Sequence, residues 1–282
     1  MRKIQRIFPL QSVTEGAGVQ LRRGFSNREV ELFDPFLLFD DFSNTEASAY
    51  QAGFPMHPHR GMETVTYLLK GEVAHKDSMG NAGSIGAGDV QWMTAGSGIV
   101  HEEMPVVCEG GIQGFQLWVN LPSKDKMMSP RYQEIKSTEI PEVAEEGISV
   151  RVIAGQYKDT RGPVQDLMVL PTYLDVSLDP LTVFSFPSTF EENFFVYAVK
   201  GRLMVRDDRS ELWVGEGNIG LLSHDTQFSC TAGKEGVRFL LIGGKPLNES
   251  ISWSGPIVMN TEAELQTAME DLQNGTFIKN AK

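Results

Sequence analysis

One pattern of strand and turn occurs twice in this chain of 282 residues. Residues 65–73 read VTYLLKGEV, and residues 195–203, which begin 130 positions later, read FVYAVKGRL. Residues 86–90 read GAGDV, and residues 215–219, which begin 129 positions later, read GEGNI. Because the two offsets nearly agree, we expect one supersecondary plan to be used twice along the chain.

Both copies of the pattern are typical of β-structure. The first segment of each copy is a run of β-branched and aromatic residues that ends at a glycine, as a strand entering a turn does. The second segment is a glycine-rich turn followed by another apolar run, VQWM in one copy and IGLL in the other. With 28 Gly and 14 Pro available for turns, such short strands predict a closed all-β sandwich or jelly roll.

A polar segment separates the two copies. Residues 131–147 read RYQEIKSTEIPEVAEEG and lack the alternation of apolar and polar residues that marks a strand. We therefore expect this segment to cross between two barrels. The predicted domains are residues 1–135 and residues 136–282.

Helix is expected to be a minor element. Start signals occur near the C-terminus, where Asn260 or Thr261 would be the N-cap of a helix rich in acidic residues in its first turn. The pattern continues to about Gln273, and Asn274 and Gly275 follow as a stop signal.

Composition excludes several classes of protein. Apolar residues make up 41% and charged residues 22%, which is the balance of a folded globular chain rather than a disordered one. The net charge of −12 repels phosphate backbones, so direct nucleic-acid binding is not expected. No apolar run approaches the length of about 20 residues needed to span a bilayer, so a cytoplasmic protein is expected, or a nuclear one in a eukaryote. Cys108 and Cys230 are expected to be reduced thiols.

The chemistry-bearing residues lie in two short segments. His57 and His59 are two residues apart, so in a strand both imidazoles leave the same face, and Pro58 between them favours a strand end or edge. His101 and Glu103 repeat the same spacing. The chain has only 5 His, and two surface imidazoles in a turn are the alternative explanation of the first pair. Two such pairs on neighbouring strands predict a site for a divalent ion of iron, nickel, manganese, copper, cobalt or zinc.

These segments resemble the pirin branch of the cupin superfamily. The resemblance is carried by PHPHRGMETVTYLLKGEV and GDVQWMTAGSGIVHEEMP, and further by DPFLLFDDF, GFQLWVNLP and GPIVMN. It implies an all-β fold of two tandem cupin (jelly-roll) barrels with a short C-terminal helix. It also implies one metal ion per chain, most often Fe2+, held by four side chains: His57, His59, His101 and Glu103.

The carboxylate ligand is open to two assignments. The usual cupin pattern takes it from the first motif, which here means Glu63, whereas the pirin resemblance takes it from the second motif. We expect Glu103 to bind the metal and Glu63 to be a hydrogen-bonding group close to the site or in the core. Glu102 has the opposite strand parity from Glu103 and should point away from the metal.

The C-terminal barrel is expected to be metal-free. The offset of 130 positions relates His57, His59 and Glu63 to Pro187, Thr189 and Asn193. The offset of 129 positions relates His101 and Glu103 to Cys230 and Ala232. These five residues do not make a set of metal ligands.

Other polar residues near the motifs have simpler interpretations. His75 and His224 are expected to be solvated residues in turns, and Cys108 to be an inert thiol. Arg60 follows the first histidine pair and is expected to form an ion pair with Glu63, with orientation of a ligand as the alternative.

The pirin resemblance implies quercetin 2,3-dioxygenase activity. Four protein ligands on a six-coordinate ion leave about two open positions, which suit a flavonol-like chelating substrate and O2. Glu103 would then act as general base. The alternative is an iron-dependent, redox-sensitive interaction protein that regulates transcription or a metabolic enzyme through a protein partner. A storage or carbohydrate-binding cupin would not need this ligand set, and a monomer is expected.

Overall fold

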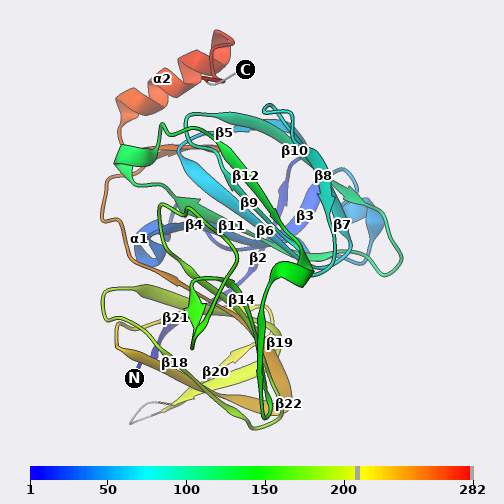
Figure 1. The fold of residues 1–282 in the computed structure, drawn as a ribbon, viewed down its shortest axis with the longest axis vertical. Helices are drawn as coiled ribbons and strands as arrows, with labels where there is room; N and C mark the ends of the chain where they lie inside the picture. Colours follow the sequence, from blue (N-terminus) through cyan, green and yellow to red (C-terminus); the bar gives the residue numbers. More distant parts are fainter. Residues whose placement is uncertain (207–209, 280–282) are drawn as a thin grey trace. The chain divides into compact units, whose positions relative to one another are not determined.

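A computed structural model describes residues 1–206 and 210–279 of the chain. The chain folds into two compact units, and neither is one continuous stretch of sequence (Figure 1). The C-barrel comprises Met1–Leu10, Glu31–Pro35 and Thr138–Pro246. The N-barrel comprises Gln11–Val30, Phe36–Ser137 and Leu247–Lys282. Both are built mainly of antiparallel strands, in agreement with the predicted fold class.

Each end of the chain belongs to the other barrel than the one expected from the predicted division at residues 135 and 136. The N-terminal strand β1 (Ile4–Pro9) belongs to the C-barrel because it pairs with β21 (Asn218–Leu222). The C-terminal residues belong to the N-barrel, where Ile257 forms a parallel bridge with Arg60. Local sequence patterns carry no information on pairing between residues about two hundred positions apart.

The N-barrel consists of a seven-stranded and a four-stranded sheet. In spatial order the larger sheet contains β12 (Arg131–Ile135), β9 (Val90–Thr94), β6 (Met62–Lys70), β11 (Gln113–Asn120), β4 (Phe36–Asp41), β3 (Val19–Phe25) and β2 (Gln11–Glu15). The smaller sheet contains β5 (Phe54–His59), β10 (Ile99–Val106), β7 (Glu72–Asp77) and β8 (Ala82–Ile85). Two short helical turns complete its connections, η1 (Ala47–Ala49) and η2 (Ser123–Asp125), whereas α1 (Val30–Phe33) and η3 (Ser137–Glu139) belong mostly to segments of the C-barrel.

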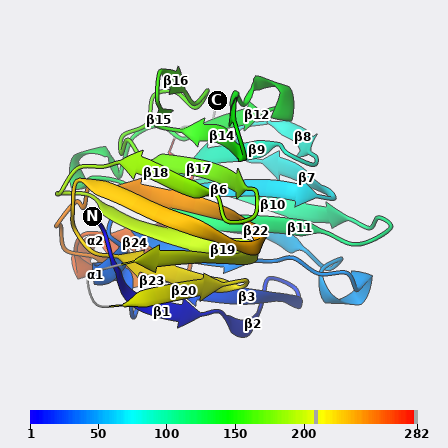
Figure 2. The ribbon, with the colours of Figure 1, turned by 90° about the horizontal axis from the view of Figure 1, so that it is seen from below.

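The C-barrel is built on one nine-stranded sheet. Its main path is β1, β21, β19 (Asn193–Arg206), β22 (Gln227–Gly244), β17 (Thr172–Leu178), β14 (Ile148–Ala154) and β13 (Glu142–Glu145). Two strands pair off this path, β18 (Val183–Pro187) with β22 and β20 (Glu211–Gly215) with β19, and a small ribbon is formed by β15 (Gln156–Tyr157) and β16 (Thr160–Arg161). The long strands β19 and β22 lie side by side, as Figure 2 shows, and each pairs with several other strands along its length.

The sequence repeat takes different forms in the two barrels. In the N-barrel, the glycine at position 71 separates β6 of the larger sheet from β7 of the smaller one. In the C-barrel, β19 continues through Gly201, where its pairing with β22 shifts register. Both glycines have positive φ, 89° and 72°, a conformation that glycine adopts without steric cost.

The segment predicted to cross between the barrels contains more structure than expected. Residues 131–135 form β12, which pairs in register with β9, and residues 142–145 form β13. The crossing is therefore shortened to residues 136–141. The prediction of an irregular segment was wrong here because edge strands carry many polar residues on their solvent side.

The predicted C-terminal helix is confirmed. After the short hairpin of β23 (Ser252–Ser254) and β24 (Ile257–Met259), α2 spans Glu262–Gln273. Thr261 is its N-cap, and its hydroxyl and the side chain of Glu264 form a capping box. The helix buries Leu265 and Ala268 in an apolar cluster with residues of β24. Among the described residues, no helix has the length and apolar character needed to cross a membrane.

Candidate metal centre

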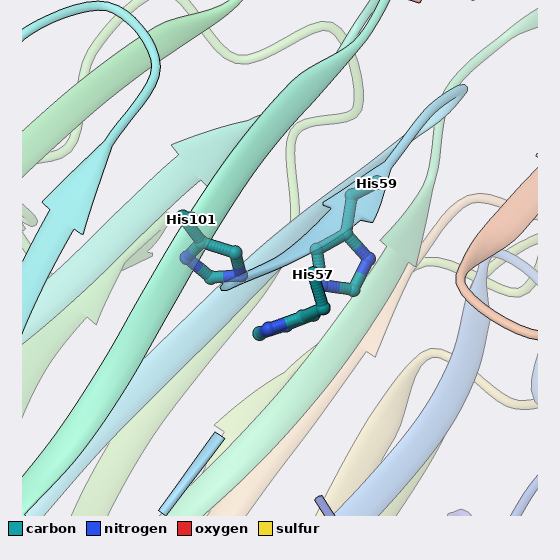
Figure 3. A group of neighbouring side chains, drawn as sticks. All are labelled: His57, His59 and His101. Carbon is teal, nitrogen blue, oxygen red and sulfur yellow. The ribbon is translucent and has the colours of Figure 1, made fainter. Parts of the chain in front are cut away.

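Three of the four predicted metal ligands come together in the N-barrel. β5 and β10 pair antiparallel so that His101 lies directly opposite His57. Figure 3 shows the rings of His57, His59 and His101 gathered around one space between these strands. The ring centroids are 4.4 to 5.1 Å apart, and one nitrogen from each ring lies within 4.8 Å of the others. This triad is the only group of three or more potential metal ligands among the described residues.

The position of β5 at the edge of its sheet explains the sequence around the histidines. β5 pairs only with β10, so one side of its backbone is free of ladder bonds. Pro55 and Pro58 lack an N–H and are tolerated in such an edge strand. The alternation around Pro58 directs both imidazoles to the same face, as the spacing predicted.

Two of the imidazoles are oriented by backbone carbonyls. Nδ1 of His57 lies 2.9 Å from the carbonyl oxygen of Pro55, and Nδ1 of His59 lies 3.3 Å from that of Pro256. Because a carbonyl oxygen only accepts, each Nδ1 carries the proton and donates it. The Nε2 atoms are thereby left with lone pairs, which is the tautomer that a metal-binding histidine needs.

The third imidazole has no hydrogen-bond partner. His101 is fully buried, and both its ring nitrogens lack a partner in the described structure. Burial is the main reason why the pKa of His101 is well below its ordinary value, and the neighbouring His59 and His57 lower it further. Burial likewise lowers the pKa of His59 to about 3, with His57 adding to the shift. Buried, neutral imidazoles without partners are costly for a fold, and a divalent cation would satisfy them. The residues present therefore fit a metal ion.

Glu103 lines the same cavity as His57 and His59 but lies outside the close group of ring nitrogens. Its Oε1 accepts hydrogen bonds from the hydroxyl of Thr66 at 2.9 Å and from the amide of Gln91 at 3.1 Å. Its Oε2 takes part in neither bond. β10 pairs with β7 without a register shift across His101 and Glu103, and the shift in its pairing with β5 comes from an extra residue of β5, so the two side chains leave the same face of β10.

Glu63 lies on the opposite face of β6 from Thr66. Its pairing with β9 and β11 is regular over this stretch, so the odd spacing directs the two side chains to opposite sides of the sheet. The Glu63 carboxylate accepts bonds from Trp92 Nε1 at 3.0 Å and from Thr94 Oγ1 at 2.6 Å, and burial raises its pKa. This arrangement matches the predicted hydrogen-bonding role in the core.

Arg60 pairs with the C-terminal helix, and the predicted pair with Glu63 was wrong. Its guanidinium is buried, donates to Asp271 Oδ2 and to the carbonyl of Phe277, both at 2.8 Å, and lies over the Phe277 ring. Arg60 has the opposite parity from His59, so it points away from the triad and toward α2. Since Pro256 also holds His59, the C-terminal segment supports the histidine pair from two sides.

His75 is buried and contacts the triad, although the sequence predicted a solvated residue. Its ring lies 5.4 Å from that of His101, stacks on Tyr132 at 4.5 Å and bonds Asp77 through Nε2 at 3.2 Å. The spacing of His75 and Asp77 repeats that of the recognised pairs, and this signal could have placed both on an inward face of β7. By contrast, His224 is exposed in the C-barrel, as predicted, and its Nδ1 lies 2.8 Å from the carbonyl of Phe190.

A cavity of about 590 Å³ adjoins the triad. Its wall contains His57, His59 and Glu103, together with apolar and aromatic side chains. Trp118 packs edge-on against His59, with ring centroids 5.2 Å apart, and Trp253 lies beside Trp118. The larger apolar and aromatic side chains of the wall are Val19, Leu21, Leu38, Phe42, Tyr50, Phe54, Val73, Trp118 and Trp253. A planar aromatic molecule in this cavity would be in contact with such walls and with the imidazoles of His57 and His59 at once.

Fold and site together define a two-barrel cupin whose N-barrel carries a cluster of three histidines that could hold a metal ion. Residues 18–119 match the family model of pirin, and residues 173–278 match that of the pirin C-terminal cupin domain. The chain belongs to the pirin family.

Individual relatives support this assignment over nearly the whole length. A pirin-like protein of Caulobacter vibrioides is 42% identical over 98% of this chain and 99% of its own. Human pirin is 41% identical over 93% of this chain and 89% of its own. The crystal structure of a quercetin 2,3-dioxygenase from Acinetobacter baumannii superposes with a TM-score of 0.88 at 36% identity and covers 98% of both chains.

Proposed function

We propose that the chain is a metal-dependent dioxygenase that cleaves a flavonol such as quercetin with O2 and releases carbon monoxide. The observation that carries the proposal is the triad of half-buried His57 and buried His59 and His101 beside an aromatic-lined cavity of about 590 Å³. The name of the Acinetobacter baumannii relative, quercetin 2,3-dioxygenase, agrees with it.

The proposed metal ligands are the triad and Glu103. Nε2 of His57 and of His59 and one nitrogen of His101 would bind the ion, and the Glu103 carboxylate would be the fourth ligand. Imidazole and carboxylate suit several first-row ions, and we propose Fe2+. When bound, the ion would lower the pKa of a chelating hydroxyl and hold the resulting anion beside dioxygen.

The protein side chains have separate proposed tasks. Glu103 takes the proton of the chelating hydroxyl, and its bonds from Thr66 and Gln91 hold the carboxylate in place. Trp118 fixes the ring plane of His59 by edge-on packing. The apolar wall excludes water from the reacting ring, which strengthens each of these polar interactions.

Oxygen consumption tests the proposal. Protein purified without oxygen and reconstituted with Fe2+ should consume O2 with quercetin and release carbon monoxide. Glu103→Gln should lower kcat by about 10²–10⁴-fold at saturating metal, as expected for a lost general base. Glu102→Gln is the matched control, since Glu102 lies on the other strand parity and should leave turnover unchanged. Absence of turnover with iron, nickel, copper, manganese and cobalt would remove the dioxygenase proposal.

The second candidate is a redox-sensitive interaction protein. It is favoured by the position of the triad near an edge strand, where Met56 beside His57 is 50% exposed. A change in iron oxidation state would alter the charge close to that surface, and the net charge of −12 suits a basic partner. Pull-downs with ferrous, ferric and metal-free protein should then retain different partners. Identical partners in all three states would contradict this candidate.

A further inference from the structure

Besides the histidines, which are its first polar group, the cavity wall carries a cluster of charged side chains on the larger sheet of the N-barrel. Arg23 of β3 donates from Nε to Asp40 Oδ1 at 2.9 Å and from Nη2 to Asp40 Oδ2 at 2.8 Å. It also donates from Nη1 to Glu15 Oε1 at 2.9 Å. All three residues line the cavity that also contains His57 and His59. The triad lies on the smaller sheet, so the two polar groups belong to different walls of one cavity.

A neighbouring ion pair shows that sheet pairing alone does not explain this arrangement. Arg22 pairs with Asp41 at 2.6 Å, directly adjacent on the same two strands, but neither residue lines the cavity. The alternation of the strands sends one arginine–aspartate pair inward and the other outward.

Burial makes the inward pair costly. Asp40 is 5% exposed, and burial raises the pKa of its carboxyl to about 6 despite the bonds from Arg23. A well-packed apolar pair would stabilise this position at least as well. An ion pair whose carboxylate is buried in a cavity wall is therefore a candidate recognition site.

The charges and hydrogen-bonding capacity select one class of ligand group. One guanidinium faces two carboxylates, so the cluster is net negative and disfavours sulfate, phosphate or carboxylate substituents. Arg23 uses three of its five N–H groups in the bonds to Asp40 and Glu15. A phenolic hydroxyl fits what remains, because it donates to a carboxylate and accepts from a guanidinium N–H.

We propose that Arg23, Asp40 and Glu15 form a recognition point for neutral phenolic hydroxyl groups on a ligand whose chelating end lies at the histidine triad. The inference rests on the proposed dioxygenase function and names its substrate class: polyhydroxylated aromatic compounds rather than their anionic conjugates. The sheets of a sandwich lie about 10 Å apart, a separation that a flat three-ring flavonol is long enough to bridge. Arg23 is thus a specificity-determining residue.

Binding of two flavonols to iron-loaded protein under nitrogen tests the proposal without turnover. Quercetin carries ring hydroxyls beyond the chelating pair, whereas 3-hydroxyflavone carries only the chelating hydroxyl and carbonyl. By isothermal titration calorimetry, quercetin should bind about tenfold more tightly to the unmodified protein, the effect of one or two hydrogen bonds. Arg23→Gln should remove this preference while leaving the affinity for 3-hydroxyflavone unchanged.

Two further variants keep the test decisive. Arg22→Gln is the matched control and should retain the full preference. Glu15→Gln changes a carboxylate whose side chain is 43% exposed, so it should fold normally and reduce the preference by a few-fold even if Arg23→Gln does not fold. Equal binding of the two flavonols, or a preference unchanged in both cavity variants, would overturn this inference alone. Failure of the unmodified protein to bind either flavonol would overturn the dioxygenase proposal together with it.

Discussion

The two barrels follow one plan but differ in the side chains that fill them. The N-barrel places imidazoles at positions 57, 59 and 101 around one point. At the positions that the repeat offset relates to His101 and Glu103, the C-barrel has Cys230 and Ala232, which are buried in an apolar cluster that also contains Phe184 and Phe228. A β-barrel fold therefore depends on the strand and turn pattern, while a few inward positions determine whether it can bind a metal.

The difference also concerns stability. The apolar interior of the C-barrel is satisfied by packing alone. The N-barrel buries the imidazole of His101, and neither of its ring nitrogens has a hydrogen-bond partner. The metal-free form is therefore destabilised by the cost of removing these nitrogens from water. We expect the stability of the N-barrel to depend on a bound ion and that of the C-barrel not to depend on one.

The largest expected effect is on metal content, which should change with a substitution in the N-barrel but not with one in the C-barrel. His101→Ala removes one of three clustered imidazoles and should lower metal affinity by at least about 100-fold, since incomplete ligand sets bind far more weakly. Elemental analysis of untagged protein should then show about one ion per unmodified chain and nearly none in the variant. The matched variant Cys230→Ala should retain the metal. Equal metal content in the unmodified protein and His101→Ala would contradict the assignment.

The second-largest effect is expected on removal of the metal, which should destabilise the N-barrel only. An ion present at 100 times its dissociation constant stabilises the state that binds it by about 2.7 kcal/mol. Hydrogen exchange followed by mass spectrometry should show that a chelator weakens the protection of β5 and β10. Protection of β18 and β22 should not change. Loss of protection spread evenly over both barrels would mean that the metal does not act through the N-barrel alone.

Acidification should destabilise the metal-free N-barrel at moderately low pH. In the unfolded chain, His59 takes up a proton near its ordinary pKa of 6.5, whereas in the folded barrel its pKa is about 3. The unfolded state therefore binds more protons between these values, so stability falls as pH decreases from about 6.5 toward 3. His101 shifts in the same direction and adds to the effect.

Tryptophan fluorescence can report this transition for the N-barrel alone. Three of the four tryptophans, at positions 92, 118 and 253, belong to the N-barrel, and Trp213→Phe removes the one in the C-barrel. In that variant the urea concentration at the midpoint of unfolding should decrease as the pH is lowered. The decrease should be smaller when His59→Gln is added. A midpoint that rises on acidification would contradict the proposed burial of neutral imidazoles.

The smallest expected effect concerns the ion pairs that anchor the two ends of the chain. Asp271→Asn weakens the bonds to buried Arg60, which should cost about 1–3 kcal/mol and lower the melting temperature of the N-barrel by several degrees. In the C-barrel, Asp225 pairs with the terminal amine of Met1 at an exposed position. Asp225→Asn should leave melting unchanged, because exposed pairs contribute little. A larger shift for Asp225→Asn would reverse this ranking.

Much of the fold and part of the site could be predicted because their signals are local. The repeat, the Gly-rich turns and the capping residues around Thr261 predicted two β-units and the C-terminal helix. The spacing of His57, His59 and His101 predicted the triad, since a strand converts a two-residue spacing into a shared face.

The remaining features depend on contacts between distant residues. The partner of Arg60 is Asp271, which is 211 positions away, and no local pattern indicates it. His75 was interpreted as a turn residue because the polar segment around it hides the alternation of β7. Glu103 leaves the same face of β10 as His101, as its spacing predicted, but its bonds from Thr66 and Gln91 on other strands are not indicated by any local pattern. Its role as a metal ligand stays a prediction.

The central claim is that one metal ion binds where His57, His59 and His101 meet. Anomalous diffraction from crystals grown with ferrous salt under nitrogen tests it most directly. We expect a single peak per chain, about 2.0–2.2 Å from one nitrogen of each of the three imidazoles. A peak in the C-barrel, or none at the triad, would contradict the account.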